Sequence, residues 1–232
     1  MVVSKDSRVI TSALSVSLSY DLARAPSDTR AVNQEQIDRA LLDAVFQFAV
    51  EHPDPKITRF NDSMRNWGDV YQPVRQAYLP AADCLTAAVE GAESPAKEIL
   101  ALFETHKSQL FWEQSYKKED NLVPDAMLAN YGFAEVLGSR GPFVSNRIRA
   151  GIGIYGPGVH YPRHQHKAEE IYLPLSGTAK FTIGDISSER GPGNVAFVSS
   201  NTPHGFTVGP DQALIVYYLW QAGDLRQTSS FG

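Results

Sequence analysis

Apolar residues recur every three or four positions in the first part of the chain, and this is the spacing of an amphipathic helix. The clearest run follows Asn33, which is a favourable N-cap, with Gln36 placed three residues later to complete a capping box. Pro53 stops the pattern, so a helix is predicted between these signals. Its apolar stripe consists of Ile37, Leu41, Ala44, Val45 and Phe48.

Two further helices are predicted before the texture of the sequence changes. The Ser94-Pro95 pair marks the start of one, because proline is favoured at the first helical position, and its apolar residues continue toward Phe111. The other covers residues 81–89 and is ended by Gly91. The segment 53–67 lacks this periodicity and is predicted to be a loop.

From about residue 131 the apolar residues form short runs that are separated by glycine and proline. Runs of this length, with turns such as Gly191-Pro192-Gly193 between them, are typical of antiparallel sandwiches and barrels. They occupy residues 132–137, 148–155, 170–175, 178–183, 195–198, 206–208 and 213–220.

The two textures together predict a mainly β protein with a helical N-terminal half. Residues 1–130 form a mainly helical region, and residues 131–232 form a β-barrel domain. The boundary is a change of secondary structure and has no linker composition, so we expect the helices to pack on one barrel.

The composition resembles that of an ordinary soluble globular protein and excludes several other classes. The 232 residues are 43% apolar and contain a single cysteine, which excludes a disulfide framework and a cysteine-rich zinc site. A net charge of −5, without clustered lysine or arginine, argues against nucleic-acid binding. The apolar run 213–220 is far shorter than the ~20 residues that cross a membrane. Residues 1–21 lack the apolar core of a signal peptide, so we expect a cytoplasmic protein without membrane contact.

Histidines are concentrated in one part of the predicted barrel, where four of the six lie in a window of 45 residues. His164 and His166 are two residues apart, so their side chains share one face of a strand. Glu170 and Tyr172 share a face of the next segment in the same way, and a turn between the segments would bring the two pairs together. A third imidazole, His204, follows a proline that stiffens its turn.

Three imidazoles and a carboxylate form a ligand set that suits a borderline divalent metal ion. Fe, Mn, Ni, Co and Zn are all compatible with it, and we expect one ion per chain, bound by His164, His166, Glu170 and His204. Such a set leaves coordination positions open for water or substrate on a metal of higher coordination number, whereas structural zinc sites are closed. The sequence therefore predicts a catalytic metal site.

The spacing of these residues resembles the first motif of the cupin family. The segment Gly158-x5-His164-x-His166-x3-Glu170-x6-Gly177 matches that motif at every specified position. The fold that this resemblance implies is the cupin double-stranded β-helix, also called a jelly-roll barrel.

The second cupin motif keeps its register but has different flanking residues. Gly193 and His204 have the spacing of the motif, while Ser199, Asn201 and Val208 stand where the motif has proline, glycine and asparagine. The resemblance therefore supports His204 as a metal ligand and leaves the shape of its loop open.

A narrower resemblance is carried by aromatic residues around the ligands. Tyr172 lies two residues after the glutamate, Tyr161 lies five before His166, and Trp220 lies sixteen after His204. This pattern, with a helical half before a C-terminal cupin, is similar to the cupin-type dimethylsulfoniopropionate (DMSP) lyases and to their DddL branch. The resemblance implies a metal-dependent lyase that cleaves this small zwitterion by β-elimination to dimethyl sulfide and acrylate.

Roles for the aromatic residues follow from that resemblance. Tyr172 is the candidate base, because a nearby divalent cation favours the phenolate of a residue whose ordinary pKa is about 10. Tyr155, Tyr161 and Trp220 are candidates for binding the sulfonium cation on their faces. In a regular strand Tyr161 points away from His164, although Pro162 interrupts that regularity.

Two other functions remain open on the sequence alone. A cupin dioxygenase uses the same kinds of ligand with Fe(II) or Ni(II) and oxygen, and a non-enzymatic small-molecule-binding cupin shares the fold. The oligomeric state is also open, with the homodimer as a common form of this fold.

The remaining histidines, the second glutamate and the cysteine have structural expectations. His160 lies outside the motif and is expected on the surface or behind the ligands, and Glu169 is expected to face solvent. His52 and His106 lie in helical segments and are expected on the surface. Cys84 is expected to be a small buried hydrophobe.

Overall fold

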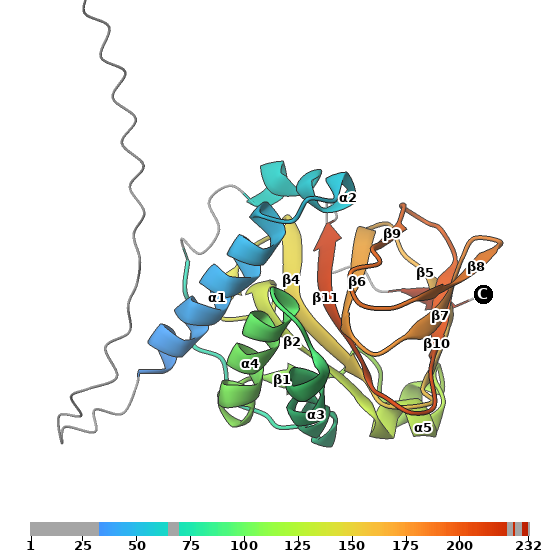
Figure 1. Ribbon diagram of the computed structural model, residues 1–232, viewed down its shortest axis with the longest axis horizontal. Coiled ribbons are helices and arrows are strands. Elements are labelled where there is room, and N and C mark those ends of the chain that lie inside the picture. The colour runs from blue at the N-terminus through green and yellow to red at the C-terminus, as the bar shows by residue number, and fades with distance from the viewer. Residues whose placement is uncertain (1–32, 65–69, 222–224, 226–228, 232) are drawn as a thin grey trace, which may run out of the picture. The chain divides into compact units, whose positions relative to one another are not determined.

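The longest helices of the protein lie on one side of a large β-sheet, and a smaller sheet lies on its other side (Figure 1). The computed structural model describes residues 33–64, 70–221, 225 and 229–231. All of them fall within the unit Val32–Gly232. The protein is therefore mainly β with helices on its N-terminal side, as predicted. The expectation for residues 1–21 lies outside the described residues.

Helix α1, Gln34–Val50, begins at its predicted N-cap and ends three residues before Pro53. The side chain of Asn33 accepts the N–H of Glu35 at 3.3 Å, and the side chain of Gln36 accepts the N–H of Asn33 at 3.3 Å. These bonds satisfy N–H groups that have no partner inside the helix. Ile37, Leu41 and Val45 of the apolar stripe are buried in a core that also contains residues of the large sheet. Ala44 and Phe48 are only partly buried.

The other helical segments are shorter, and all but the last two precede the first strand of the large sheet. They are α2 (Pro55–Thr58), η1 (Asn61–Met64), η2 (Pro80–Asp83), α3 (Cys84–Gly91), α4 (Ala96–His106), η3 (Lys107–Gln109), η4 (Lys118–Asp120) and α5 (Asp125–Ala129). None of the described helices has both the length and the apolar composition of a membrane span.

The predicted loop over residues 53–67 is wrong where α2 and η1 form. Asp54 caps α2 by accepting the N–H of Lys56 at 2.8 Å, and Pro55 occupies its first position. Residues 65–67 of that prediction lie outside the described part of the chain. The helix at residues 81–89 is confirmed as η2 and α3, while α4 ends at His106 and continues only as the tighter turn of η3.

The strands form two sheets that are almost entirely antiparallel. They are β1 (Trp112–Glu113), β2 (Tyr131–Gly138), β3 (Phe143–Val144), β4 (Ile148–Tyr155), β5 (His160–Gln165), β6 (Glu169–Ser176), β7 (Ala179–Ile183), β8 (Ile186–Arg190), β9 (Ala196–Val198), β10 (His204–Val208), β11 (Leu214–Gln221) and β12 (Ser230–Phe231). The large sheet has the order β1-β2-β4-β11-β6-β9 with β3 beside β2, and the small sheet has the order β12-β5-β10-β7-β8. The predicted runs correspond to β2, β4, β6, β7, β9, β10 and β11.

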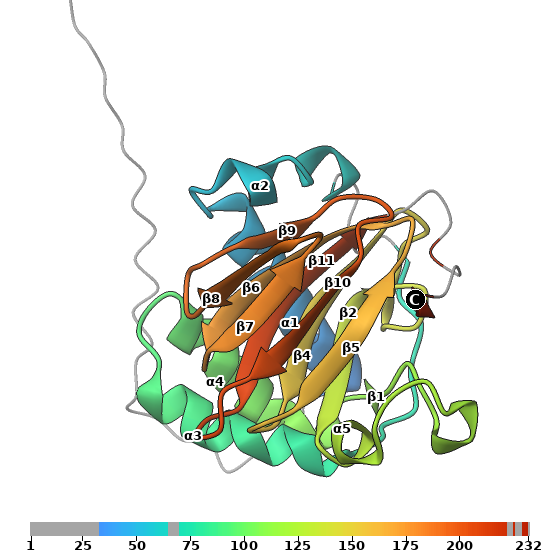
Figure 2. The ribbon, with the colours of Figure 1, turned by 90° about the vertical axis from the view of Figure 1, so that its right-hand side faces the viewer.

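The large sheet has two chemically different faces, because successive side chains of a strand point to opposite sides. The helix-facing side is apolar, and the hydroxyl of Tyr217 donates to the Val45 carbonyl of α1 at 3.0 Å. The other side faces the small sheet across the interior of the sandwich (Figure 2). Residues of β4, β6 and β11 on the helix-facing side are Ile148, Ala150, Ile152, Ile154, Ile171, Leu173, Leu175, Ile215, Tyr217 and Leu219.

A bulge interrupts β5 in the small sheet. His204 of β10 pairs with His164, whereas Phe206 pairs with Tyr161, so two steps on β10 correspond to three on β5. One extra residue in β5 reverses the alternation of its side chains. Tyr161 and His164 are consequently both buried on the interior side.

Candidate metal centre

Three imidazoles and one carboxylate meet between the two sheets. His164 lies on β5, His166 follows the end of that strand, Glu170 lies on β6 and His204 opens β10. A ligand nitrogen from each of the three histidines lies within 4.8 Å of the other two. Glu170 Oε2 is 2.9 Å from His166 Nε2 and 3.4 Å from His204 Nε2. All four side chains are buried, so the structure brings together the residues that the sequence selects as ligands.

Each imidazole is oriented by a backbone carbonyl two residues away in the chain. The Nδ1 to carbonyl distances are 2.9 Å for His164 with Pro162, 3.0 Å for His166 with Ala168 and 2.8 Å for His204 with Thr202. A carbonyl oxygen only accepts, so each Nδ1 carries a proton and donates. The Nε2 lone pair of each neutral ring is left for another partner.

These donor atoms fit a divalent metal ion. His204 Nε2 is buried and has no hydrogen-bond partner among the described residues, although Glu170 Oε2 lies 3.4 Å away. His166 Nε2 faces the same carboxylate, and two acceptors meet at such a distance only when a proton or a cation lies between them. Neutral imidazoles with a carboxylate are ligands that borderline divalent metals prefer. The buried three-histidine site therefore fits a metal-binding cupin.

Burial and neighbouring charges shift the pKa values of the candidate ligands, and these shifts determine their protonation at neutral pH. Burial lowers the pKa of His164 to about 4, so its ring is neutral and available to a metal. Burial disfavours the ionised form of Glu170, but the hydrogen bond from His166 and the charges of His166 and His204 outweigh it and lower the pKa of this carboxyl to about 2. Burial likewise disfavours protonated His166, yet the Glu170 carboxylate raises the pKa of this ring. Glu170 is thus ionised across the neutral range and available to a metal ion.

A cavity of about 330 Å³ borders these ligands, within the size range of small-molecule sites. His164, His166 and Glu170 form one part of its wall. The aromatic residues that line it are Tyr116, Phe133, Tyr155, Tyr161, Tyr172, Tyr218 and Trp220. A metal bound here would face a pocket in which polar ligands and aromatic rings lie side by side.

Tyr172 lies in this wall two residues after Glu170, on the same side of β6. Its ring centroid is 6.1 Å from that of His204 and 5.7 Å from that of Phe206. Burial raises the pKa of Tyr172 well above its ordinary value, and the charge of Glu170 raises it further. The chain by itself therefore keeps Tyr172 protonated, so its use as a base requires a positive charge nearby.

Comparison with known proteins assigns the chain to a family. A family model for dimethylsulfoniopropionate lyases matches residues 57–216. The chain belongs to the DMSP lyase family. Among curated relatives, the DMSP lyase DddQ of Ruegeria pomeroyi is 40% identical over 92 residues, which cover 39% of this chain and 45% of that protein. The putative DMSP lyase DddL of Cereibacter sphaeroides is 30% identical over 119 residues, which cover 51% of this chain and 48% of that protein.

Solved structures of DMSP lyases share the fold over most of the chain. The crystal structure of DddQ from Ruegeria pomeroyi DSS-3 matches with a TM-score of 0.72 and 26% identity, covering 85% of this chain and 96% of that one. A structure from a study of the DMSP lyases RdDddP and RnDddQII also has a TM-score of 0.72, at 24% identity, and covers 86% of this chain. In sequence, the aligned stretches span about half the length of the curated relatives.

The bulge in β5 explains how Tyr161 joins the pocket of this DMSP lyase family member. Its ring stacks on that of His164 with centroids 4.4 Å apart, although a regular strand would turn the two side chains in opposite directions. Tyr155 stacks on Tyr161 at 5.7 Å and lines the same cavity. Both predicted aromatic residues are therefore placed at the pocket.

Tyr116 is a pocket residue that the sequence did not reveal. Its hydroxyl is 3.0 Å from that of Tyr161, and its backbone N–H donates to the hydroxyl of Tyr131 at 3.1 Å. The residue lies in a segment without strand or helix periodicity, so no signal in a single sequence points to it.

Trp220, the third predicted aromatic residue, lies directly beside the ligands. Its indole Nε1 donates to His166 Nε2 at 3.4 Å, and the two ring centroids are 5.4 Å apart. The guanidinium of Arg149 lies over the indole ring, 4.7 Å from its centroid.

Charged residues in the same wall were also missed by sequence reasoning. Glu135, Arg140 and Arg149 line the cavity, and Arg140 pairs with Glu113 at 3.1 Å. Arg149 pairs with Glu135 at 3.5 Å. The pairing of Arg149 with Glu135 depends on the register of β2 with β4, which a single sequence does not fix.

The residues with structural expectations lie outside the three-histidine site. His160 is exposed and its Nδ1 is 3.0 Å from the hydroxyl of Thr207. Glu169 is only partly exposed and pairs with Arg59 at 3.0 Å, so it does not simply face solvent. The ring of His106 is partly buried and lies 3.0 Å from the side chain of Gln109.

A second cavity, of about 630 Å³, lies among α1, α3 and the end of β6. His52 and Cys84 are partly buried in its wall. His52 is therefore less exposed than expected, and Cys84 is less buried than expected.

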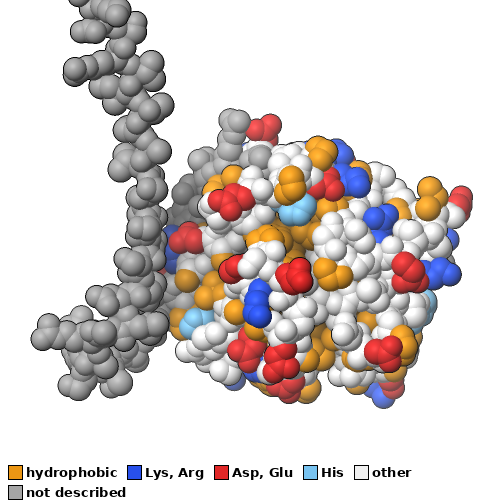
Figure 3. Space-filling model, in the orientation of Figure 1, with side chains coloured by type: hydrophobic (Ala, Val, Ile, Leu, Met, Phe, Trp, Pro, Cys, Tyr) orange, Lys and Arg blue, Asp and Glu red, His pale blue; other side chains and the backbone are white. Residues whose placement is uncertain are grey.

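The face of the molecule in Figure 3 carries acidic and basic side chains that are interspersed, without a continuous basic patch.

Proposed function

We propose that the protein cleaves DMSP to dimethyl sulfide and acrylate by a metal-dependent β-elimination. The observation that carries the proposal is the placement of Tyr172 in one pocket wall with His164, His166 and Glu170, and next to His204, in a member of the DMSP lyase family. His164, His166, Glu170 and His204 would hold one divalent ion. When bound, that ion polarises the substrate carboxylate as a Lewis acid and favours the tyrosine phenolate by its charge.

The residues of the chain perform the remaining chemistry. The Tyr172 oxygen takes a proton from the carbon next to the carboxylate, and the electron pair of that C–H bond forms the carbon–carbon double bond. The C–S bond breaks at the same time, so its electron pair leaves with dimethyl sulfide and acrylate remains. Tyr155 and Tyr161 line the pocket and bind the sulfonium cation over the part of their faces that the stacked neighbouring rings leave uncovered, with about 0.5–2 kcal/mol per contact. Their rings also exclude water from the pocket.

The decisive experiment is anaerobic incubation of metal-loaded protein with DMSP, with dimethyl sulfide measured in the headspace. We expect release that stops with a chelator and returns on addition of Fe, Mn, Zn, Ni or Co, and the ion that restores the highest rate identifies the preferred metal. Tyr172→Phe should lower kcat by about 100-fold or more, because a positioned base contributes about 10²–10⁴-fold.

Tyr217→Phe is the matched control for Tyr172→Phe. Tyr217 is an equally buried tyrosine on the neighbouring strand, but its hydroxyl bonds to α1 on the opposite face of the sheet. Its removal should cost about 1 kcal/mol of stability and leave kcat unchanged. Absence of dimethyl sulfide with every metal, or equal loss of kcat in both variants, would refute the proposal.

Three further assignments rest on the sequence and remain predictions. They are the division of the chain into residues 1–130 and 131–232, the cytoplasmic location, and the homodimer as an open alternative.

A further inference from the structure

The surroundings of Trp220 point to a specific use of its indole ring. In the large sheet Trp220 of β11 pairs with Arg149 of β4 on one side and with Glu170 of β6 on the other. Paired residues of neighbouring strands point to the same face. Trp220 therefore stands in a row between a cationic side chain and a metal ligand.

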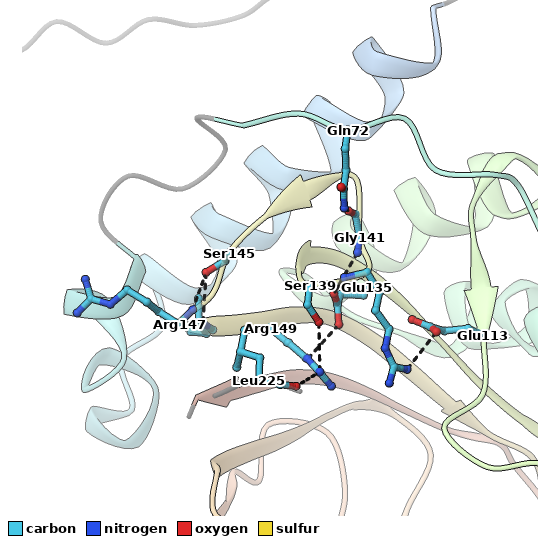
Figure 4. Close-up of polar contacts among 11 residues, drawn as sticks. Gln72, Glu113, Glu135, Ser139, Gly141, Ser145, Arg147, Arg149 and Leu225 are labelled. Carbon is cyan, nitrogen blue, oxygen red and sulfur yellow. Dashed lines mark hydrogen bonds and ion pairs between the residues drawn. The ribbon is translucent and has the colours of Figure 1, made fainter. Parts of the chain in front are cut away.

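Arg149 is firmly fixed over the indole. Its Nη2 donates to the Ser139 hydroxyl at 3.2 Å and to the Leu225 carbonyl, and its Nε pairs with Glu135 at 3.5 Å (Figure 4). These contacts leave the guanidinium over the ring of Trp220, 4.7 Å from the centroid.

Glu135 holds Arg149 in this place. Its side chain is buried, and Oε1 accepts the backbone N–H groups of Arg140 at 2.6 Å and Gly141 at 3.0 Å. Moving Arg149 away would take its charge from a buried carboxylate, which is costly. The sheet therefore keeps a cation on Trp220 before any substrate arrives.

A guanidinium on the indole makes the ring a poor site for a second cation. The negative face of the ring already interacts with Arg149, and a sulfonium added beside it would be repelled by the like charge. Among the described residues, no cation–π contact places a cation on Tyr155 or Tyr161. The tyrosine wall is thus the better place for the sulfonium.

The N–H edge of the indole, in contrast, lacks a good acceptor. Nε1 lies 3.4 Å from His166 Nε2, which is long for a hydrogen bond, and that nitrogen also approaches Glu170 at 2.9 Å. A nitrogen that gives its lone pair to a metal accepts nothing further. The indole N–H then remains a buried donor at the ligand end of the pocket.

We propose that Trp220 binds the substrate through its N–H, which donates to a carboxylate oxygen. In this proposal Arg149 is a positioning residue, because its guanidinium occupies the indole face and leaves the N–H edge for the substrate. The inference rests on the proposed function, because it concerns the anionic end of the same zwitterionic substrate. It divides the pocket into an anion-binding end at Trp220 and the ligands, and a cation-binding end at Tyr155 and Tyr161.

The test uses two probes that each carry one charge of the substrate. Propionate and trimethylsulfonium are titrated calorimetrically into metal-loaded full-length wild-type protein and Trp220→Phe. Phenylalanine keeps an aromatic face and removes the donor. We expect propionate to bind at least about tenfold more weakly to the variant, as for loss of a hydrogen bond to a charged group, while trimethylsulfonium is unaffected.

Every other pattern overturns the donor role. If only trimethylsulfonium binds more weakly to Trp220→Phe, the indole face is the site of the sulfonium. If both probes bind more weakly by the same factor, the substitution disturbs the whole pocket. If neither affinity changes, Trp220 does not bind the substrate. Trp112→Phe is the matched control, because that indole lies in the core and donates to the Lys107 carbonyl. It should bind both probes as the wild type does.

Arg149 is tested by a double-mutant cycle on propionate binding. If Arg149 acts only through the indole, Arg149→Met weakens propionate, and Arg149→Met adds nothing further in a Trp220→Phe background. Additive effects would show that Arg149 contacts the anion itself and would overturn the positioning role. Arg149→Lys retains a charge for Glu135 without a planar group over the ring, so it replaces Arg149→Met in the cycle if that variant does not fold.

Dimethyl sulfide release by the same wild-type protein separates this inference from the proposed function. Selective loss of propionate binding in Trp220→Phe, without wild-type release, upholds the donor and refutes the lyase. If the wild type releases dimethyl sulfide and Trp220→Phe binds propionate as tightly as the wild type does, the lyase function is upheld and the donor role is refuted.

Discussion

The two faces of the large sheet use the same strands for different purposes. On the helix-facing side, Leu219 and its neighbours are apolar and closed to solvent. On the interior side, the adjacent Trp220 lies among histidines, carboxylates and guanidinium groups. Because alternation alone separates the two sets, a shift of one position along β11 changes the expected consequence of a substitution from stability to binding.

The largest effect should follow removal of a ligand from the interior side. His204→Ala deletes a buried nitrogen and is expected to weaken divalent-metal binding by more than about 100-fold, since even the partners behind such ligands are worth about 10–100-fold. Competition with a chromophoric chelator measures the affinity. His160→Ala, which removes an exposed imidazole from β5, should bind metal normally. Stoichiometric, tight metal in His204→Ala would remove this residue from the ligand set.

A substitution on the helix-facing side should lower stability and leave metal affinity unchanged. Leu219→Ala opens a space in a fully buried site and should lower the free energy of unfolding by about 2–5 kcal/mol. Metal affinity of the folded protein should stay at the wild-type value, because the side chain points away from the ligands. Urea denaturation and the chelator competition measure the two quantities. A matching fall in metal affinity would mean that the faces are energetically coupled.

Lowering the pH should lower the free energy of unfolding of the metal-free protein, because His164 is buried in its neutral form. The pKa of its ring is about 4 in the folded chain and about 6.5 in an unfolded one. The unfolded state therefore takes up the proton first, and the stability from this residue is present above about pH 6.5 and lost as the pH falls toward 4. Urea denaturation in chelator between these pH values should give a steeper loss for wild type than for His164→Gln. Equal slopes would contradict the lowered pKa.

The smallest effect is expected at Glu169, whose partner Arg59 is largely exposed. Glu169→Gln should change the free energy of unfolding by about 0–1 kcal/mol, as for other surface ion pairs, with no change in metal affinity. The neighbouring Glu170→Gln replaces a buried ligand and should weaken metal binding strongly. If Glu169→Gln weakened metal binding and Glu170→Gln did not, Glu169 would be the carboxylate ligand, and the register of β6 would be contradicted.

The sequence predicts much of this arrangement because the signals involved are local. Capping residues and periodicity predict α1, and the alternating or continuous apolar runs predict the central strands. The ligand spacing brings His164, His166 and Glu170 together because β5 and β6 follow each other in the chain after a short turn, one strand in each sheet.

What the sequence did not reveal depends on tertiary pairing or on weak local patterns. Strand β8, Ile186–Arg190, is mostly exposed and has no alternation, and β1, β3 and β12 contain two residues each. The bulge of β5 arises from its pairing with β10. Arg149 and Glu135 were missed for the same reason, since an arginine and a glutamate on separate strands are ordinary surface residues until the register is known.

The three carbonyls that hold the imidazoles each lie within two residues of the ring that they orient. The orientation of each imidazole is therefore determined within a tripeptide, and only the distances between these tripeptides depend on the barrel. A designer could transplant the three short segments into another antiparallel scaffold and obtain correctly turned rings without copying the surrounding core. Variation among natural barrels could in the same way alter the pocket walls while the ligands keep their orientation.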